Sequence, residues 1–172
     1  SRGLGDVYKR QVAYRNIKEI IPKLIEENKP KVFLGLGLAG GRPNITVERL
    51  AINIMDSEKP DNEGYKAFDE PIFKDGPAAF FATIPIKQII KSLRENKIPA
   101  MVSNSAGTFL CNALFYTASY TTWKNKMKTL VGFMHLPLLP EQVLDKAQPS
   151  LTEEQMIRAV KIALNESIKA WK

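Results

Sequence analysis

The stretch Lys-Val-Phe-Leu-Gly-Leu-Gly-Leu (residues 31–38) decides the fold class of this chain. It is a short apolar run, typical of a strand that is buried on both faces of a sheet. Before it, isoleucine and leucine recur at helical spacing over residues 16–28, which predicts an amphipathic helix, although Pro22 indicates a kink or a later start. After it, a glycine-rich loop leads into a second predicted strand, residues 45–54.

The same alternation continues to the C-terminus. Residues 56–76 are rich in Pro, Gly, Asp and Asn and predict a long ordered loop. Further helices are predicted over residues 86–96 and 107–120, and a last one follows the Thr152–Gln155 capping box; further strands are predicted over residues 98–103 and 129–135. We therefore expect an α/β fold, a three-layer α/β/α sandwich with a mostly parallel or mixed central sheet.

Length and composition restrict the class of protein. The 172 residues suffice for one domain, residues 1–172, and are too few for two ordinary ones. The formal net charge is +7, but the basic residues are interleaved with Glu and accompany no nucleic-acid-binding motif, so we expect no nucleic-acid partner. No apolar run approaches the ~20 residues that cross a bilayer, so no membrane partner is expected. A single cysteine cannot form an internal disulfide, which favours the cytoplasm.

The single cysteine and the single histidine are candidates for chemistry. A thiolate is a nucleophile and a nearby imidazole supports that charge state, although a lone buried Cys is usually a small apolar side chain. Cys111 follows a predicted strand and a turn of small residues, so it lies early in a helix, where free backbone N–H groups favour negative charge. His135 ends the next strand. If those two strands are parallel, both residues meet at one edge of the sheet.

Glu48 is the candidate for a third member, which would orient the imidazole. It is a carboxylate among apolar residues in Ile-Thr-Val-Glu-Arg-Leu-Ala-Ile-Asn (residues 45–53). The alternative interpretation is a structural ion pair between Glu48 and Arg42 or Arg49. The residue pattern alone leaves both open.

Four segments carry a resemblance to a known family. They are Gly-Gly-Arg (residues 40–42) with Glu-Arg-Leu-Ala-Ile-Asn (48–53), Pro-Asp-Asn-Glu-Gly (60–64) with Asp-Glu-Pro (69–71), Ser-Asn-Ser-Ala-Gly-Thr-Phe-Leu-Cys-Asn (103–112), and Gly-Phe-Met-His-Leu-Pro (132–137) with Pro-Glu-Gln (140–142). In order and spacing they resemble pyroglutamyl peptidase I, also called pyrrolidone-carboxylate peptidase, cysteine peptidase family C15. The resemblance covers roughly residues 16–171 and includes all three candidate catalytic residues.

The resemblance implies a thiol hydrolase that removes an N-terminal pyroglutamyl residue from peptides through a thioester, without metal or cofactor. Cys111 would be the nucleophile, His135 the general acid and base, and Glu48 its orienting partner. Leu38, Phe109, Leu110 and Lys59 would approach the pyroglutamyl ring. The resemblance also implies a cytoplasmic homo-oligomer, a dimer or a tetramer.

The chain departs from the family pattern in three places. The family begins with a strand and a Phe-Gly-Gly loop that have no counterpart here, and residues 1–11 are atypical, so we expect a fragment in which residues 12–172 are family-like and the first strand is missing. Glu58 and Lys59 replace an Arg-Ile pair, and Leu38 replaces a common Gln. These changes leave open a thiol hydrolase of altered acyl specificity, or a non-catalytic binding protein on the same fold.

Overall fold

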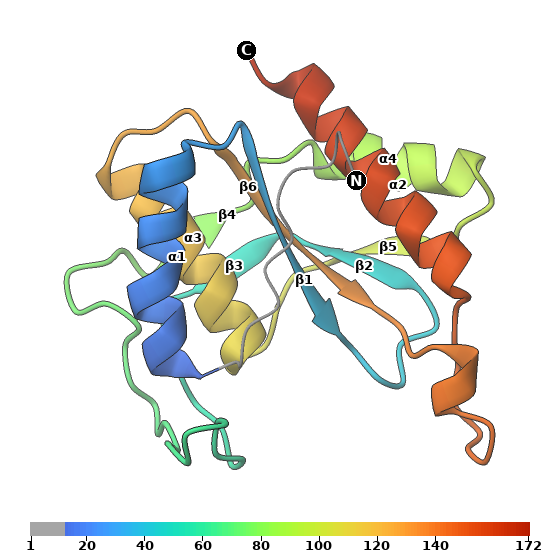
Figure 1. Cartoon of the computed structure of the whole chain (residues 1–172), viewed down its shortest axis with the longest axis horizontal. Coiled ribbons are helices and arrows are strands. Elements are labelled where there is room, and N and C mark those ends of the chain that lie inside the picture. Colours follow the sequence, from blue (N-terminus) through green and yellow to red (C-terminus); the bar gives the residue numbers. More distant parts are fainter. Residues whose placement is uncertain (1–12) are drawn as a thin grey trace.

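The computed structural model describes residues 13–172, and the atypical segment 1–11 lies outside the described residues. Helix α1 (Tyr14–Asn28) is followed by β1 (Val32–Leu38), β2 (Ile45–Glu48), β3 (Leu50–Ile52), β4 (Ala79–Phe81), α2 (Ile86–Glu95), β5 (Ala100–Ser103), α3 (Leu110–Lys124), β6 (Leu130–Leu136), the short 3₁₀ helix η1 (Pro140–Gln142) and α4 (Glu153–Ala170). Figure 1 shows the strands between α1 and α3 on one side and α2 and α4 on the other. The expected α/β sandwich is confirmed.

Four strands form the central sheet in the order β1-β6-β2-β5. β1 is parallel to β6 and β2 is parallel to β5, whereas β2 and β6 are antiparallel. The sheet is therefore mixed, and the strands before Cys111 and at His135 run in opposite directions. The assumption that they are parallel was wrong, because β2 lies between them and reverses the direction of the chain.

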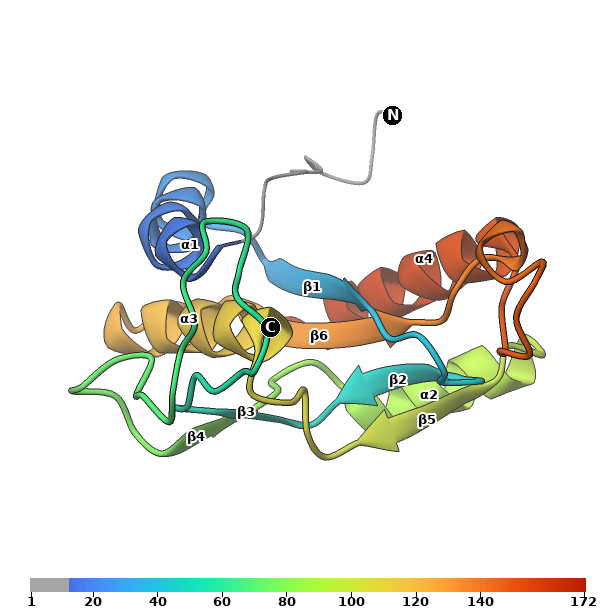
Figure 2. The same cartoon turned by 90° about the horizontal axis from the view of Figure 1, so that it is seen from below.

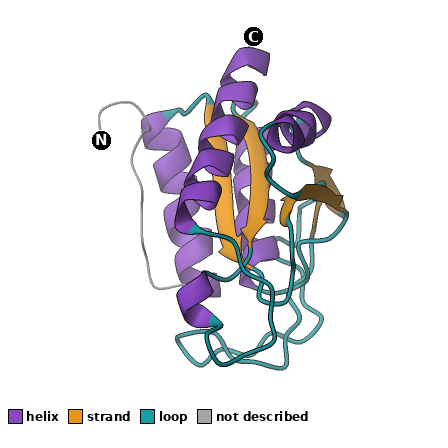
Figure 3. Ribbon diagram, turned by 90° about the vertical axis from the view of Figure 1, so that its right-hand side faces the viewer, coloured by secondary structure: helices purple, strands orange, loops and turns teal. Residues whose placement is uncertain are grey.

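Alternation along the strands divides the core into two apolar layers. Ile45, Val47 and Met134 pack on the side of α2 and α4, whereas Phe33, Val131 and Phe133 pack with α1 and α3. Figure 2 shows α1 and α3 gathered at one end of the molecule and α2 and α4 at the other, and Figure 3 shows the strands passing between the helices. Thr46, Glu48 and His135 therefore face the α3 side, because they alternate with residues of the other layer.

The structure differs from the predicted elements at the strand 45–54, at β4 and at the start of α1. The predicted strand 45–54 divides at Arg49, whose N–H bonds the Ser103 carbonyl while its own carbonyl accepts from Ala82 N–H, so that β3 leaves the central sheet and pairs with β4. Strand β4 was not predicted. Helix α1 runs from Tyr14 through Pro22, so it starts earlier than the proline indicated, and it ends at Asn28, which Lys29 follows in the left-handed conformation.

The predicted C-terminal capping box is present. The Gln155 N–H donates to the Thr152 hydroxyl at 3.3 Å, and the Thr152 N–H donates to the Gln155 side-chain oxygen at 3.2 Å. These reciprocal bonds satisfy two donors at the start of α4 and fix where the helix begins. Within residues 13–172 no helix is long and apolar enough to cross a membrane.

Candidate active site

The site lies where the carboxyl ends of β1 and β6 meet the N-terminal end of α3. Gly37 on β1 pairs with His135 on β6, and His135 pairs in turn with Thr46 on β2. A Cβ atom added to Gly37 would lie 2.8 Å from the sulfur of Cys111. Glycine at this position therefore lets the first turn of α3 approach the sheet, which brings Cys111 beside His135.

Cys111 is the second residue of α3 and is half-buried. The N-cap residue Phe109 has an extended backbone, and its side chain makes no capping hydrogen bond. The helical bonds begin with Ala113 N–H to the Phe109 carbonyl at 3.0 Å. Helix geometry leaves the N–H groups of the first turn without partners inside the helix, so they are free to face an anion beside Cys111.

Asn112 attaches this end of α3 to β3. It is fully buried, its side-chain oxygen accepts from Ile52 N–H at 2.9 Å, and its amide donates to the carbonyls of Ile52 and Ile54 at 2.9 and 3.0 Å. Sequence reasoning did not assign Asn112 a role. A buried amide directly after the candidate nucleophile, in a mostly apolar helix, is the signal that could have found it.

His135 and Glu48 form a close buried pair. Nδ1 of His135 lies 2.7 Å from Oε1 of Glu48, and the two side chains are 7 % and 0 % exposed. Because Nδ1 is bonded to the carboxylate, Nε2 is the nitrogen left for Cys111. Burial alone would lower the pKa of His135, but hydrogen bonds with Cys111 and Glu48 outweigh it and raise the pKa to about 9.

Glu48 receives further donors at the same oxygen. Arg42 Nη1 donates to Oε1 at 2.9 Å and the Thr46 hydroxyl lies 3.2 Å from it. Burial acts to raise the pKa of Glu48, but hydrogen bonds with His135 and Arg42 lower it overall. Ser103, which pairs with Glu48 across β2 and β5, donates its hydroxyl to the Ser105 carbonyl at 3.1 Å. Oε2 of Glu48 has no hydrogen-bond partner in the described chain.

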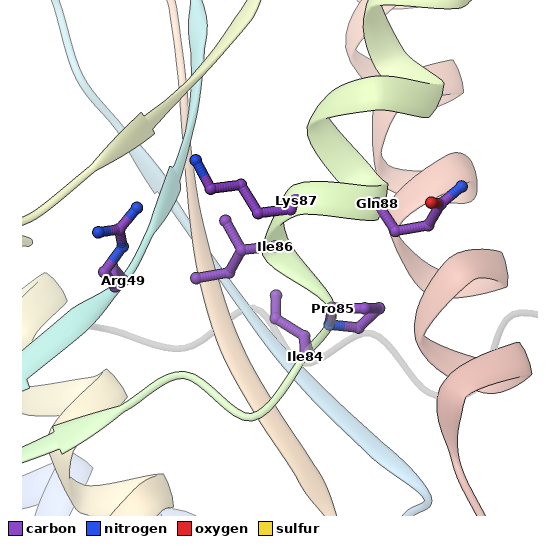
Figure 4. Close-up of a pocket in the computed structure, with 6 residues that line it drawn as sticks. All are labelled: Arg49, Ile84, Pro85, Ile86, Lys87 and Gln88. Atoms are coloured by element: carbon purple, nitrogen blue, oxygen red, sulfur yellow. The ribbon is translucent and has the colours of Figure 1, made fainter.

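The two interpretations of Glu48 therefore coexist. It forms the ion pair with Arg42 and it also contacts His135, whereas Arg49 makes no side-chain ion pair within residues 13–172. Arg49 instead lines a pocket together with residues 84–88, which lead into and form the N-terminal turn of α2 (Figure 4). Sequence reasoning considered Arg42 as a structural ion-pair partner of Glu48 and as the end of the loop 38–42 expected near the substrate ring, and it missed Thr46.

The expected substrate-binding residues fall into two groups. Leu38 ends β1 next to the Gly37–His135 pair and is 58 % exposed, while Phe109 and Leu110 directly precede Cys111. These three border the site. Lys59 lies on the exposed loop after Met55, and its side chain makes no hydrogen bond or ion pair within the described chain, so the structure does not connect it to the triad residues.

Comparison with known proteins gives the family. The pyroglutamyl peptidase family model matches residues 5–170. The chain belongs to this family. It is 52 % identical over 168 residues to the pyrrolidone-carboxylate peptidase of Thermococcus onnurineus, covering 96 % of this chain and 84 % of the relative, and 53 % identical over 162 residues to that of Thermococcus kodakarensis, covering 93 % and 79 %.

Solved structures agree with this assignment. A mutant pyrrolidone carboxyl peptidase from Pyrococcus furiosus superimposes with a TM-score of 0.87 at 41 % identity, covering 90 % of this chain and 77 % of that one. The pyrrolidone carboxyl peptidase from Thermococcus litoralis gives 0.86 at 38 % identity, covering 92 % and 74 %. The family resemblance inferred from four short segments is confirmed, and with it the assignment as a cysteine peptidase.

Proposed function

We propose that this chain removes an N-terminal pyroglutamyl residue from peptides, with Cys111 as nucleophile, His135 as general acid and base, and Glu48 as the group that orients the imidazole. One observation carries the proposal: the sole histidine lies between a buried carboxylate 2.7 Å from Nδ1 and the sole cysteine. A thiol, an imidazole and a carboxylate in this order form the arrangement that activates a nucleophile for acyl transfer.

The chemistry follows from the protonation states. With its pKa raised to about 9, His135 is an imidazolium at neutral pH and stabilises a neighbouring thiolate. The thiolate of Cys111 attacks the pyroglutamyl carbonyl, and the first-turn N–H groups of α3 receive the negative charge on its oxygen. Collapse of this intermediate breaks the C–N bond while His135 gives its proton to the departing amine. Water, deprotonated by the same imidazole, then cleaves the thioester.

Recognition of the lactam is assigned to Leu38 and Phe109. The two residues that flank β1 hydrogen-bond β6: the Lys31 carbonyl accepts from Leu130 N–H, and Ala39 N–H donates to the Leu136 carbonyl. The odd-numbered positions along β1 therefore direct their backbone groups toward β6. In a parallel ladder the alternate residue Leu38 then directs its N–H and C=O toward the opposite edge, where a lactam donor and acceptor could bind them. Phe109, held edge-on by Tyr14 at 5.7 Å, offers an apolar face to the ring.

A substrate panel tests this proposal. Pyroglutamyl, prolyl and acetyl amides of a fluorescent coumarin are compared, with and without iodoacetamide, which alkylates the single thiol. We expect thiol-sensitive release from the pyroglutamyl amide only, because a prolyl substrate would bring an unpaired ammonium into the pocket. Release from the acetyl amide instead would indicate altered acyl specificity. Glu58 and Lys59 would then be the first residues to replace with the Arg-Ile pair of the family. A folded protein that hydrolyses none of them would contradict the proposal and favour a different acyl specificity or a non-catalytic role.

We further propose that the protein is a cytoplasmic homo-oligomer, a dimer or a tetramer. Large apolar side chains that are exposed in the single chain support this, among them Phe81 at 70 % and Leu144 at 86 %. Light scattering of the purified chain over a range of concentrations measures the mass directly. A monomer at all concentrations would contradict the proposal.

A further inference from the structure

Arg42 lies in the loop between β1 and β2, and its side chain contacts Glu48 of the candidate triad. It follows the turn at residues 39–42, closed by Arg42 N–H to the Ala39 carbonyl at 3.3 Å, and Gly41 at the third position has φ +84°, as a type II turn requires. The turn reverses the chain after β1 and directs the guanidinium back over β2. Its side chain remains 36 % exposed, while the carboxylate that it contacts is fully buried.

Three donors converge on one oxygen of Glu48. Besides the His135 contact, Arg42 Nη1 donates to Oε1 at 2.9 Å and to the Thr46 hydroxyl at 2.6 Å, and that hydroxyl donates to Oε1 at 3.2 Å. Oε2 is buried and has no partner within residues 13–172. Such an arrangement fixes the rotation of the carboxylate, because any turn of the group would break three bonds at once.

We infer that Arg42, assisted by Thr46, is a positioning residue for the reaction: it holds Glu48 Oε1 against His135 and offsets part of the carboxylate charge. The inference rests on the proposed function. A carboxylate with no counter-charge would stabilise the imidazolium further and make it a poorer acid toward the departing amine. The charged groups that bear on His135 are Glu48 and Cys111 directly and Arg42 through the shared oxygen.

The experiment combines kinetics with titration of the single histidine. Arg42→Met removes the donor, Arg42→Lys keeps the charge without the guanidinium fork, and Thr46→Val removes the relay. Arg49→Met is the matched control, since it removes the same charge from a residue with no ion pair in the described chain. Because His135 is the only histidine, its imidazole carbon–proton NMR signal is read without assignment in protein free of any tag.

We expect Arg42→Met to lower kcat roughly 10- to 100-fold with KM within about twofold, the effect of one lost charge-assisted hydrogen bond to a catalytic group. The pKa of His135 should rise by about one unit, because a nearby positive charge is removed. Arg42→Lys should restore part of kcat, and Arg42→Met combined with Glu48→Gln should be no slower than Glu48→Gln alone. Arg49→Met should match the wild type.

Other outcomes overturn the inference. An unchanged or lower pKa of His135 in Arg42→Met would show that Arg42 does not offset the charge of Glu48. A raised KM with unchanged kcat would make Arg42 a substrate-binding residue. Multiplying losses in the double variant would show that Arg42 acts independently of Glu48. If the wild type releases no pyroglutamyl product, the proposed function fails, whereas the His135 titration still tests the coupling.

Discussion

The two faces of the central sheet differ although the same strands form both. On the face under α2 and α4, Ile45, Val47 and Met134 are almost fully buried and purely apolar. On the opposite face, Thr46 and Glu48 alternate with them and are equally inaccessible, yet they are polar and hydrogen-bonded. The comparison teaches that burial by itself does not define a packing residue. One strand, read at alternate positions, supplies both the stability and the chemistry.

Replacement of the nucleophile, which α3 holds against the polar face of the sheet, should give the largest loss of activity. Cys111→Ser is expected to lower hydrolysis of the pyroglutamyl amide at least about 10⁴-fold, because loss of a nucleophile removes covalent catalysis almost entirely. The unfolding midpoint should change little, since the thiol is only half-buried. Kinetics and thermal unfolding of the same preparation measure both. Activity that persists within tenfold would remove Cys111 from the proposed triad.

Glu48→Gln should have the next largest effect. We expect kcat to fall about 10³-fold, since the amide cannot stabilise the charged imidazole as the carboxylate does. The pKa of His135 should move down from about 9, because the Glu48 contact contributes to its elevation. NMR titration of His135 reports this shift. A protein that unfolds, but whose folded fraction keeps normal activity, would instead support a purely structural ion pair.

Met134→Ala tests the apolar face of the sheet at the residue next to His135 on β6. Met134 is fully buried on the α2 and α4 side, so the substitution should destabilise the protein by about 2–5 kcal/mol through lost burial and a cavity. Its kcat per folded molecule should stay within about threefold of wild type, an energy of well under 1.4 kcal/mol. Denaturant unfolding and active-site titration separate these quantities. A large loss of kcat would show that the two faces are not independent.

The polar face of the sheet should also make the stability of the protein depend on pH, through His135. The pKa of His135 is raised in the folded state, so its contribution is fully present below about 6.5 and is lost as the pH rises through about 9. The stabilisation is at most about 3 kcal/mol. Denaturant unfolding at pH 6 and pH 9.5 should therefore show a decrease in wild type. A decrease of equal size in His135→Gln would assign it to other groups.

Gly37→Ala should have the smallest effect, and it tests how closely α3 approaches the sheet. The new Cβ would lie 2.8 Å from the Cys111 sulfur and 2.9 Å from the Phe133 ring, which should cost about 1–3 kcal/mol of stability and displace the thiol. Gly40→Ala is the control, because its nearest contact, Leu138, would be an ordinary 3.5 Å. Equal effects of both substitutions on activity would show that the glycine at position 37 is not needed for the approach of Cys111.

Local sequence determined much of this protein. Short apolar runs gave the strands of the central sheet and helical spacing gave α1, α2 and α4, because both patterns follow from which side chains each element buries. The single Cys, the single His and the carboxylate at Glu48 could be selected on their chemistry, and the surrounding motifs gave the family. Strand β4 was missed because its three residues carry no periodic signal and form a strand only by pairing with β3.

Tertiary structure alone decided how these residues meet. The sequence does not reveal that β6 runs antiparallel to β2, since strand direction depends on connections and pairing far apart in the chain. That reversal, with the alternation of side chains, places Glu48, Thr46 and His135 on one face. The position of Arg42 over Glu48 depends on a turn, and the approach of Cys111 depends on the missing side chain at Gly37. These are distances between elements, which no local pattern encodes.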